Sequence, residues 1–302
     1  MRILITGGLG HIGSYLLENF PNDFEIIVAD NMFTQRYPVR LNLAKKITEF
    51  HEVDLSKVDI SNLIKRSDLV IHLSAITDAA GTADKPKIVF DNNFEATKRI
   101  VDGCSKSNIP LVFPSSTSVY GSQESLVDEN CRALNPQSPY AESKLLEENY
   151  VAEMLEKYFI LRFGTIHGCS QGMRFHTAVN KFCWQSAHGQ GVTVWKSAWN
   201  QLRPYLGLQD VLTNLLKIVN LEIPPTGQVL NFVSENSSPE EIVSIIRRRI
   251  PQCEVNFVDH AIMNQLSYEV SNINAQKLGF TFENSLERDI NETLNYLIDG
   301  IK

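Results

Sequence analysis

The sequence has few cysteines and no cysteine motif. None of the five stands in a C-x-x-C pair, and their number is odd. A disulfide scaffold or a zinc site needs cysteines at short, repeated spacings, so we expect neither and predict no metal site. Scattered thiols are typical of a reducing compartment, which indicates a cytoplasmic protein. The five positions are Cys104, Cys131, Cys169, Cys183 and Cys253.

Positive charge and long apolar runs are also scarce. The 302 residues include 28 Lys and Arg against 35 Asp and Glu, which gives a net charge of −7. Binding to nucleic acid or to an anionic membrane surface is driven by clustered Lys and Arg. The one dense basic run, residues 247–249, stands in a helical pattern that predicts a solvated face. No stretch approaches the roughly 18 apolar residues of a membrane span, so we expect neither nucleic acid nor membrane as a partner.

The sequence does contain an alternation of short apolar runs and helical patterns. Short continuous runs rich in Ile, Val, Leu and Phe are typical of strands that are buried on both faces of a parallel sheet. This alternation predicts an α/β fold with a Rossmann-type, doubly wound parallel sheet. The runs stand at 2–6, 25–29, 69–73, 110–114 and 158–163, and the helical patterns at 12–20, 96–107 and 141–155.

The composition changes after about residue 165, where Gly, His, Gln and Trp become common. We therefore predict a first domain over residues 1–165 and a smaller, partly interleaved substrate lobe over residues 166–302. The last helix has a start that resembles a capping box, because Glu287 follows Asn284 by three residues. The later helical patterns stand at 210–220, 239–249 and 286–298, and the later strand-like runs at 229–233 and 254–258.

The first predicted strand runs directly into a glycine-rich turn, T-G-G-L-G-H-I-G at residues 6–13, which opens a helix. Gly7, Gly10 and Gly13 allow a tight turn, close backbone approach to a pyrophosphate, and close packing of helix on strand. The phosphates would lie at the helix N-terminus, where N–H groups and the dipole favour anions. Asp30 ends the next strand, and a carboxylate there can bind the ribose hydroxyls and repels a 2′-phosphate. These features predict dinucleotide binding, with NAD favoured over NADP.

Tyr140 and Lys144 lie four residues apart in a helical pattern, which places them on one face. A neighbouring ammonium favours the phenolate, so we expect Lys144 to lower the pKa of Tyr140. Such a tyrosine can move a proton to or from an alcohol while a nicotinamide moves the hydride. Residues 115–118 are hydroxyl side chains after a predicted strand, at the edge where doubly wound sheets bind ligands. One of them can hydrogen-bond the reacting oxygen together with Tyr140.

On these motifs, the sequence resembles the extended short-chain dehydrogenases/reductases of the NAD-dependent sugar epimerase/dehydratase family. The matching segments follow the order of the family over about 210 residues. They are T-G-G-L-G-H-I-G at 6–13, V-A-D-N at 28–31, H-L-S-A at 72–75, D-N-N-F at 91–94, P-S-S-T-S-V-Y-G at 114–121, S-P-Y-A-E-S-K at 138–144 and R-P-Y-L-G-L-Q-D-V at 203–211.

The resemblance implies NAD as the cofactor, a nucleotide-diphosphate sugar as the substrate, and a homodimer. It implies that Tyr140 is the acid/base, that Lys144 binds the nicotinamide ribose, and that Ser116 is the catalytic hydroxyl. Besides Tyr140 and Lys144, the cofactor contacts that it implies are Gly7, Gly10, His11, Ile12, Gly13, Asp30, Asn31, Asp54, Leu55, Leu73, Ser74, Ala75 and Asn93. The substrate contacts that it implies are Ser116, Thr117, Asn180, Trp195, Arg203 and Tyr268.

Members of this family differ in the reaction that they catalyse. A 4,6-dehydratase of the family needs an acidic pair after the catalytic Ser or Thr, but Thr117 and Ser118 stand there. A non-catalytic NAD-binding regulator would typically have lost the Tyr or the Lys, and both are present. We therefore predict a nucleotide-sugar 4-epimerase that acts through a transient 4-keto sugar and tightly bound NAD. A nucleotide-sugar 4-dehydrogenase or 4-ketoreductase is the alternative, and His167, where many relatives have Tyr, leaves the sugar and nucleobase open.

Overall fold

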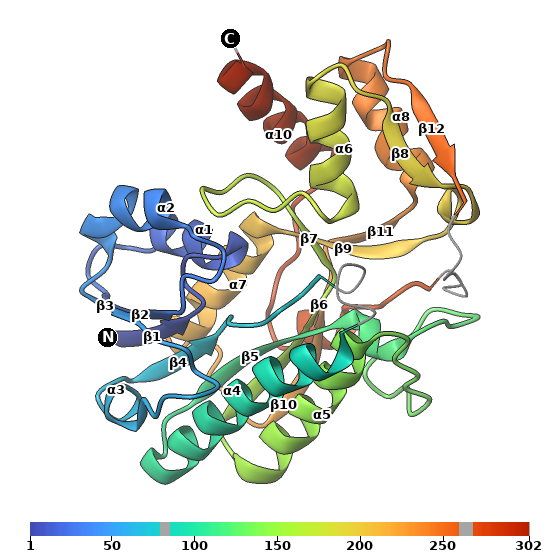
Figure 1. Ribbon diagram of the computed structural model, residues 1–302. Coiled ribbons are helices and arrows are strands. Elements are labelled where there is room, and N and C mark those ends of the chain that lie inside the picture. Colours follow the sequence, from blue (N-terminus) through green and yellow to red (C-terminus); the bar gives the residue numbers. More distant parts are fainter. Residues whose placement is uncertain (79–84, 260–267, 302) are drawn as a thin grey trace.

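A sheet of seven parallel strands forms the centre of the protein (Figure 1). The computed structural model describes residues 1–78, 85–259 and 268–301. The strand order is β10-β6-β5-β4-β1-β2-β3, which contains the 3-2-1-4-5-6 order of doubly wound folds and confirms the predicted fold class. Its strands are β1 (Arg2–Thr6), β2 (Glu25–Asp30), β3 (Glu49–Glu52), β4 (Leu69–His72), β5 (Leu111–Ser116), β6 (Tyr158–Phe163) and β10 (Gln228–Phe232).

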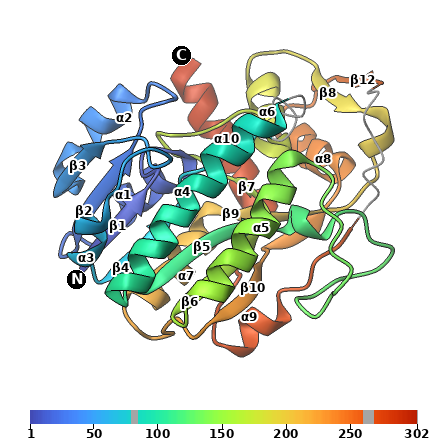
Figure 2. The same cartoon turned by 60° about the horizontal axis from the view of Figure 1, so that its bottom comes forward.

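Helices cover both faces of this sheet, because successive strand residues point to opposite faces and both sets are apolar. In β1, Ile3 and Ile5 belong to one buried cluster and Leu4 to the other. The first cluster packs against α1 (His11–Asn19), α2 (Tyr37–Asn42), α7 (Leu208–Val219) and α9 (Ile273–Lys277). The second packs against α3 (Ser61–Lys65), α4 (Pro86–Ser107) and α5 (Pro139–Met154), and α4 and α5 lie side by side across the sheet (Figure 2).

The remaining elements form a second cluster of packed structure. A three-stranded sheet has the order β11-β9-β7, and β8 pairs with β12 in parallel. Helices α6, α8 and α10 pack together around a separate apolar core, at the top of Figure 1. No helix in the described part of the chain is both long enough and apolar enough to cross a membrane. The elements are β7 (Thr165–His167), α6 (Ala178–Ala187), β8 (Val192–Trp195), β9 (Arg203–Gly207), β11 (Glu235–Ser237), α8 (Pro239–Arg249), β12 (Val255–Val258) and α10 (Leu286–Ile301).

The chain returns to the central sheet after building part of this second cluster. Strand β10 pairs with β6 through five residues, from Gln228 opposite Phe159 to Phe232 opposite Phe163. Further along, Phe280 packs edge-on against both Phe159 and Phe232. Residues from both sides of residue 165 thus share one core, and the division of the chain into domains at that point stays a prediction.

The start of α10 differs from the predicted capping box. Ser285 supplies the cap, because its hydroxyl accepts the Arg288 N–H at 3.2 Å. The Asn284 amide instead donates to Asp289, and Glu287 forms an exposed ion pair with Arg248. The predicted capping residues, Asn284 and Glu287, were therefore wrong, because the buried Asp289 carboxylate accepts the Asn284 side-chain amide.

Candidate functional site

A cavity of about 640 Å³ opens at the carboxyl ends of β1, β2, β4 and β5. This edge is where a doubly wound sheet binds ligands, because the strand order reverses there. Sixteen of the residues predicted to form the site line the cavity. They are Gly7, Gly10, His11, Ile12, Gly13, Asp30, Asn31, Asp54, Leu73, Ser74, Ala75, Ser116, Thr117, Tyr140, Lys144 and Tyr268.

The glycine-rich turn joins β1 to α1 at one end of the cavity. Gly7 has a φ of +63°, and a Cβ there would lie 2.8 Å from the Ser74 backbone. A Cβ at Gly13 would lie 2.5 Å from the Gly8 carbonyl oxygen, so α1 can start this close to the turn only with glycine. Gly10 precedes α1, and no side chain caps the helix. The N–H groups and the positive dipole end of α1 therefore face the cavity and suit an anion.

Asp30 lies at the end of β2, beside this turn. Its two carboxylate oxygens accept the N–H groups of Leu9, at 3.1 Å, and of Met32, at 2.9 Å. These bonds fix the orientation of the carboxylate at the cavity wall. The negative charge lies where a 2′-phosphate of NADP would have to approach, if the dinucleotide follows α1 as it does in Rossmann folds.

Helix α5 carries Tyr140 and Lys144 into the cavity from the other side. It begins where Ser138 caps it, since the Ser138 hydroxyl accepts the Ala141 N–H at 3.2 Å, and Pro139 fits the first helical position. Tyr140 then falls in the first turn and Lys144 one turn later. The Lys144 side chain is only 3% exposed, and its Nζ lies 4.4 Å from the centre of the Phe113 ring.

The electrostatic surroundings of Tyr140 differ from the prediction. Burial is the largest influence and raises the pKa of Tyr140 above its ordinary value. The Lys144 ammonium, a hydrogen bond with Ser116 and the Arg174 charge all act to lower that pKa, but burial outweighs them. Lys144 thus acts to lower the pKa of Tyr140, as predicted. The expectation that the pKa of Tyr140 would lie below its ordinary value was wrong, because burial raises it more.

Five predicted site residues lie outside the cavity lining. Leu55 is buried in the core beneath α3 and α4. Asn93 on α4 accepts the Ile76 N–H at 2.8 Å and donates to the Ile76 carbonyl at 3.0 Å, so it holds a backbone segment that lines the cavity. Asn180 on α6 similarly accepts from Gly168 N–H and donates to the Arg174 carbonyl.

The other two, Trp195 and Arg203, belong to the second cluster of elements. Trp195 ends β8 opposite Val258 of β12. Arg203 begins β9, and its guanidinium lies 5.1 Å from the centre of the Tyr268 ring. The Tyr268 hydroxyl is 3.5 Å from Thr117 Oγ1, so Arg203 is connected to the cavity wall through Tyr268. The roles assigned to these residues stay predictions.

A segment that the sequence did not assign crosses the glycine-rich turn. We call residues 168–174 the crossing segment. His11 Nε2 donates to the Gly168 carbonyl at 2.8 Å, and burial lowers the pKa of His11 to about 4, which keeps the ring neutral. Gly172 N–H donates to Ser14 Oγ at 2.8 Å, and a Cβ at Gly172 would lie 2.4 Å from the Gly10 oxygen. The segment therefore lies directly against the start of α1.

The crossing segment ends in Arg174, a cavity residue that the sequence analysis missed. Its guanidinium donates to the Thr77 hydroxyl, and its charge is close enough to Tyr140 to lower the pKa of that phenol. The residues around Arg174 have no helical or strand period, so no sequence pattern indicated that its side chain lines the cavity. The glycine at 172 was the one available signal, because it marks a close backbone approach.

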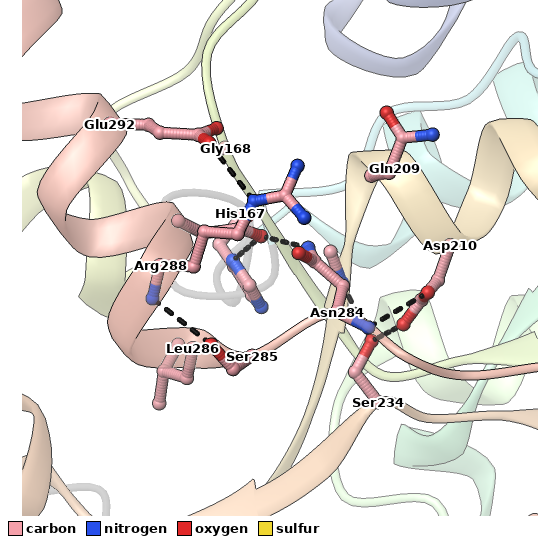
Figure 3. Close-up of polar contacts among 12 residues, drawn as sticks. His167, Gly168, Gln209, Asp210, Ser234, Asn284, Ser285, Leu286, Arg288 and Glu292 are labelled. Atoms are coloured by element: carbon pink, nitrogen blue, oxygen red, sulfur yellow. Dashed lines mark hydrogen bonds and ion pairs between the residues drawn. The ribbon is translucent and has the colours of Figure 1, made fainter.

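Buried polar contacts hold the second cluster of elements together and join it to α7. His167, which stands where many relatives have Tyr, is fully buried, and its Nδ1 lies 2.9 Å from Asp289 on α10. Figure 3 shows the carboxylate of Asp210, at the start of α7, directed at Ser234 and Asn284. It accepts the Ser234 hydroxyl at 2.5 Å and the Asn284 N–H at 3.2 Å. Asp210 belongs to the 203–211 motif, and these contacts assign it to holding the fold together.

Comparisons with known proteins identify relatives along most of the chain. The model of the NAD dependent epimerase/dehydratase family matches residues 3–231. The uncharacterized UDP-glucose epimerase YtcB of Bacillus subtilis is 28% identical over 265 residues, covering 82% of this chain and 81% of that protein. A UDP-N-acetyl-alpha-D-glucosaminuronate decarboxylase of Bacillus cytotoxicus is 25% identical over 259 residues, covering 82% and 79%.

Among solved structures, a UDP-glucuronic acid 4-epimerase from Bacillus cereus, in complex with UDP-glucuronic acid and NAD, has the same fold. The TM-score is 0.89 at 22% identity, and the match covers 100% of both chains. The family model spans the glycine-rich turn, Asp30, Ser116, Tyr140 and Lys144, and so confirms the predicted family and cofactor. The chain belongs to the NAD dependent epimerase/dehydratase family and is an enzyme that uses NAD.

Proposed function

We propose that this enzyme is a nucleotide-sugar 4-epimerase. The observation that carries the proposal is that Ser116, Tyr140 and Lys144 line the same cavity as the glycine-rich turn. That arrangement suits the removal of a hydroxyl proton beside a bound dinucleotide. The names of the relatives support a substrate of the UDP-sugar class, because those proteins are described as acting on UDP-sugars.

The residues around the turn fit a dinucleotide. The uncapped start of α1 suits a pyrophosphate, which Gly7, Gly10 and Gly13 would approach closely through the backbone. The fixed carboxylate of Asp30 would bind the adenosine ribose, and residues 73–75 line the cavity toward Tyr140. When bound, NAD supplies a reversible acceptor for the hydride at C-4 of the sugar.

The proposed proton chemistry belongs to Tyr140. Its phenolate takes the proton of the 4-hydroxyl, and Ser116 orients the sugar oxygen by a hydrogen bond. Lys144 offsets part of the cost of forming a buried phenolate, since its charge lowers the pKa that burial raises. After the 4-keto sugar has rotated to present its opposite face, C-4 would regain the hydride that it gave up, and Tyr140 returns the proton to the same oxygen, which gives the 4-epimer.

The residues after Ser116 favour epimerisation over dehydration. Elimination of water across C-5 and C-6 needs an acid and a base next to the sugar. Thr117 instead donates to the Phe163 carbonyl at 3.3 Å, and Ser118 donates to Ser116 at 2.9 Å. Neither side chain carries a carboxylate, so the position that a dehydratase needs holds only hydroxyls.

Incubation with UDP-, GDP- and dTDP-hexoses in heavy water tests the proposal. We expect one of them to give its C-4 epimer with no deuterium bound to carbon and no net NADH, because only the hydroxyl proton that Tyr140 handles exchanges with solvent. NMR of the product and absorbance at 340 nm are the measurements. Deuterium on carbon would instead indicate a dehydratase, and NADH changing one-for-one with product would indicate the alternative, a 4-dehydrogenase or 4-ketoreductase. Either result would overturn the assignment of the protein as a 4-epimerase.

The cofactor preference gives a second prediction. Asp30→Ala removes the charge that repels a 2′-phosphate, so we expect the ratio of the two dissociation constants, NADP over NAD, to fall by about tenfold or more, which is about 1.4 kcal/mol. Titration of the apoprotein by isothermal calorimetry measures both affinities. Asp59→Ala is the matched control, because the Asp59 carboxylate also accepts the N–H two residues on, at 2.8 Å, but lies outside the cavity lining. Equal affinities in the unchanged protein would contradict the assignment of Asp30.

A further inference from the structure

Helix α5 carries a third charged residue on the face that bears Tyr140 and Lys144. Glu147 follows Tyr140 by seven residues and Lys144 by three, which places all three along one helical face. The Glu147 side chain is 1% exposed, and one of its carboxylate oxygens lies 3.1 Å from Lys144 Nζ. A buried carboxylate therefore holds the ammonium that reaches the cavity.

Two hydroxyl groups complete the surroundings of this carboxylate. Thr97 on α4 donates to the oxygen that Lys144 contacts, at 2.8 Å, and Ser143 donates to the other oxygen at 2.5 Å. Every one of these neighbours is a donor, which is what an ionised carboxylate requires. A buried ion pair of this kind is costly to break, because the partner that remains is left charged and desolvated.

A chain of hydrogen bonds connects Glu147 to the glycine-rich turn. Since Thr97 uses its only proton on Glu147, it accepts from His72 Nε2, at 3.1 Å. Because Nε2 carries the ring proton, His72 Nδ1 accepts from the Thr6 hydroxyl at 2.6 Å. Burial lowers the pKa of His72 to about 3, which keeps the ring neutral. Thr6 ends β1, where the turn begins. The position of the Lys144 ammonium is thus fixed through α4, β4 and β1.

We propose that Glu147 is a positioning residue for the reaction: its carboxylate fixes Lys144 beside Tyr140 and offsets part of the ammonium charge. The inference rests on the proposed role of Tyr140 and deepens it. Lys144 and Glu147 face Tyr140 from α5, Arg174 faces it from the crossing segment, and Ser116 faces it from β5. Among these groups, Glu147 raises the pKa of Tyr140, and Lys144, Ser116 and Arg174 lower it.

Glu147→Gln removes the negative charge of this side chain but keeps its size and shape. The glutamine oxygen can still accept from Lys144 and Thr97, and its amide can donate to Ser143, so the hydrogen bonds are retained. With the negative charge gone, we expect the ionisation midpoint of Tyr140 to fall by about one pH unit. Tyrosinate absorbance at 295 nm in the apoprotein measures that midpoint, and subtraction of the Tyr140→Phe signal assigns it. The acid limb of the kcat/KM profile should move in the same direction.

Glu142→Gln is the matched control, since it removes the same charge from an exposed position on the same helix and should leave the midpoint in place. Glu147→Asp keeps the charge but moves it one methylene away from Lys144, so a smaller shift of the same sign is expected. A lower melting temperature with an unmoved tyrosinate midpoint, in either Glu147 variant, would overturn the proposal and reduce Glu147 to a structural ion pair. The titration needs no substrate, so its failure is distinct from failure of the epimerase assignment.

Discussion

Tyr140→Phe should lower kcat by a factor of about 10²–10⁴, the usual contribution of a positioned acid or base. Phenylalanine keeps the ring that packs at the start of α5 but has no proton to exchange with the sugar hydroxyl. The glycine-rich turn and Asp30 are unchanged, so bound NAD should be retained. Steady-state assays on the sugar identified in the panel give kcat, and absorbance after denaturation gives the cofactor content.

Tyr150→Phe is the matched control for this variant. Tyr150 lies on the same helix, and its hydroxyl donates to Asp102 at 2.6 Å, outside the cavity lining. We expect its kcat to stay near that of the unchanged enzyme. Turnover of Tyr140→Phe within a few-fold of normal would exclude Tyr140 from the proton transfer, whatever the reaction is.

Glu148→Gln should destabilise the protein by about 3 kcal/mol. Glu148 on α5 accepts three hydrogen bonds from Arg162 of β6, at 2.7, 3.0 and 3.3 Å, and both side chains are nearly fully buried. The Arg162 guanidinium also lies over the Tyr120 ring, 4.8 Å from its centre. Neutral glutamine leaves the guanidinium charge uncompensated in the core, and the melting temperature should fall by on the order of 5 °C.

Urea unfolding followed by circular dichroism measures the loss of stability. Glu153→Gln is the matched control, because Glu153 lies near the end of the same helix and is exposed. That variant should change the unfolding free energy by less than about 0.5 kcal/mol. If the two variants are equally stable, then a neutral acceptor replaces the Glu148 carboxylate without loss, and the charge of the buried pair does not contribute to the free energy of unfolding.

The parallel strands could be predicted because burial on both faces leaves a continuous apolar signature. β1 and β6 have the bounds that their apolar runs indicate, and Asp30 falls at the strand end where the ribose assignment needs it. Tyr140 and Lys144 could be paired because both lie within one helix. These are local features: a few neighbouring residues determine them.

Other features depend on contacts between distant parts of the chain. Helix α4 begins at Pro86, well before its predicted start at residue 96. The added turns contain the polar Asn93, which is buried against the Ile76 backbone, a contact that no helical period indicates. Arg174 reaches the cavity only because the crossing segment packs on α1, more than 150 positions away in sequence. The net rise in the Tyr140 pKa reflects burial by many residues, which no spacing of two residues could show.

The late return of β10 has a consequence for synthesis on the ribosome. Strands emerge in chain order, so β6 is complete while the partner for its open edge, Gln228–Phe232, has not yet been translated. An unpaired, apolar strand edge invites association with other nascent chains. The edge of β6 is protected only once β10 has been made. The ring contacts of Phe280 with Phe159 and Phe232 form later still, because Phe280 follows β10 in the chain. The central sheet and the aromatic core behind β6 are therefore complete only after residues 228–280 have been made.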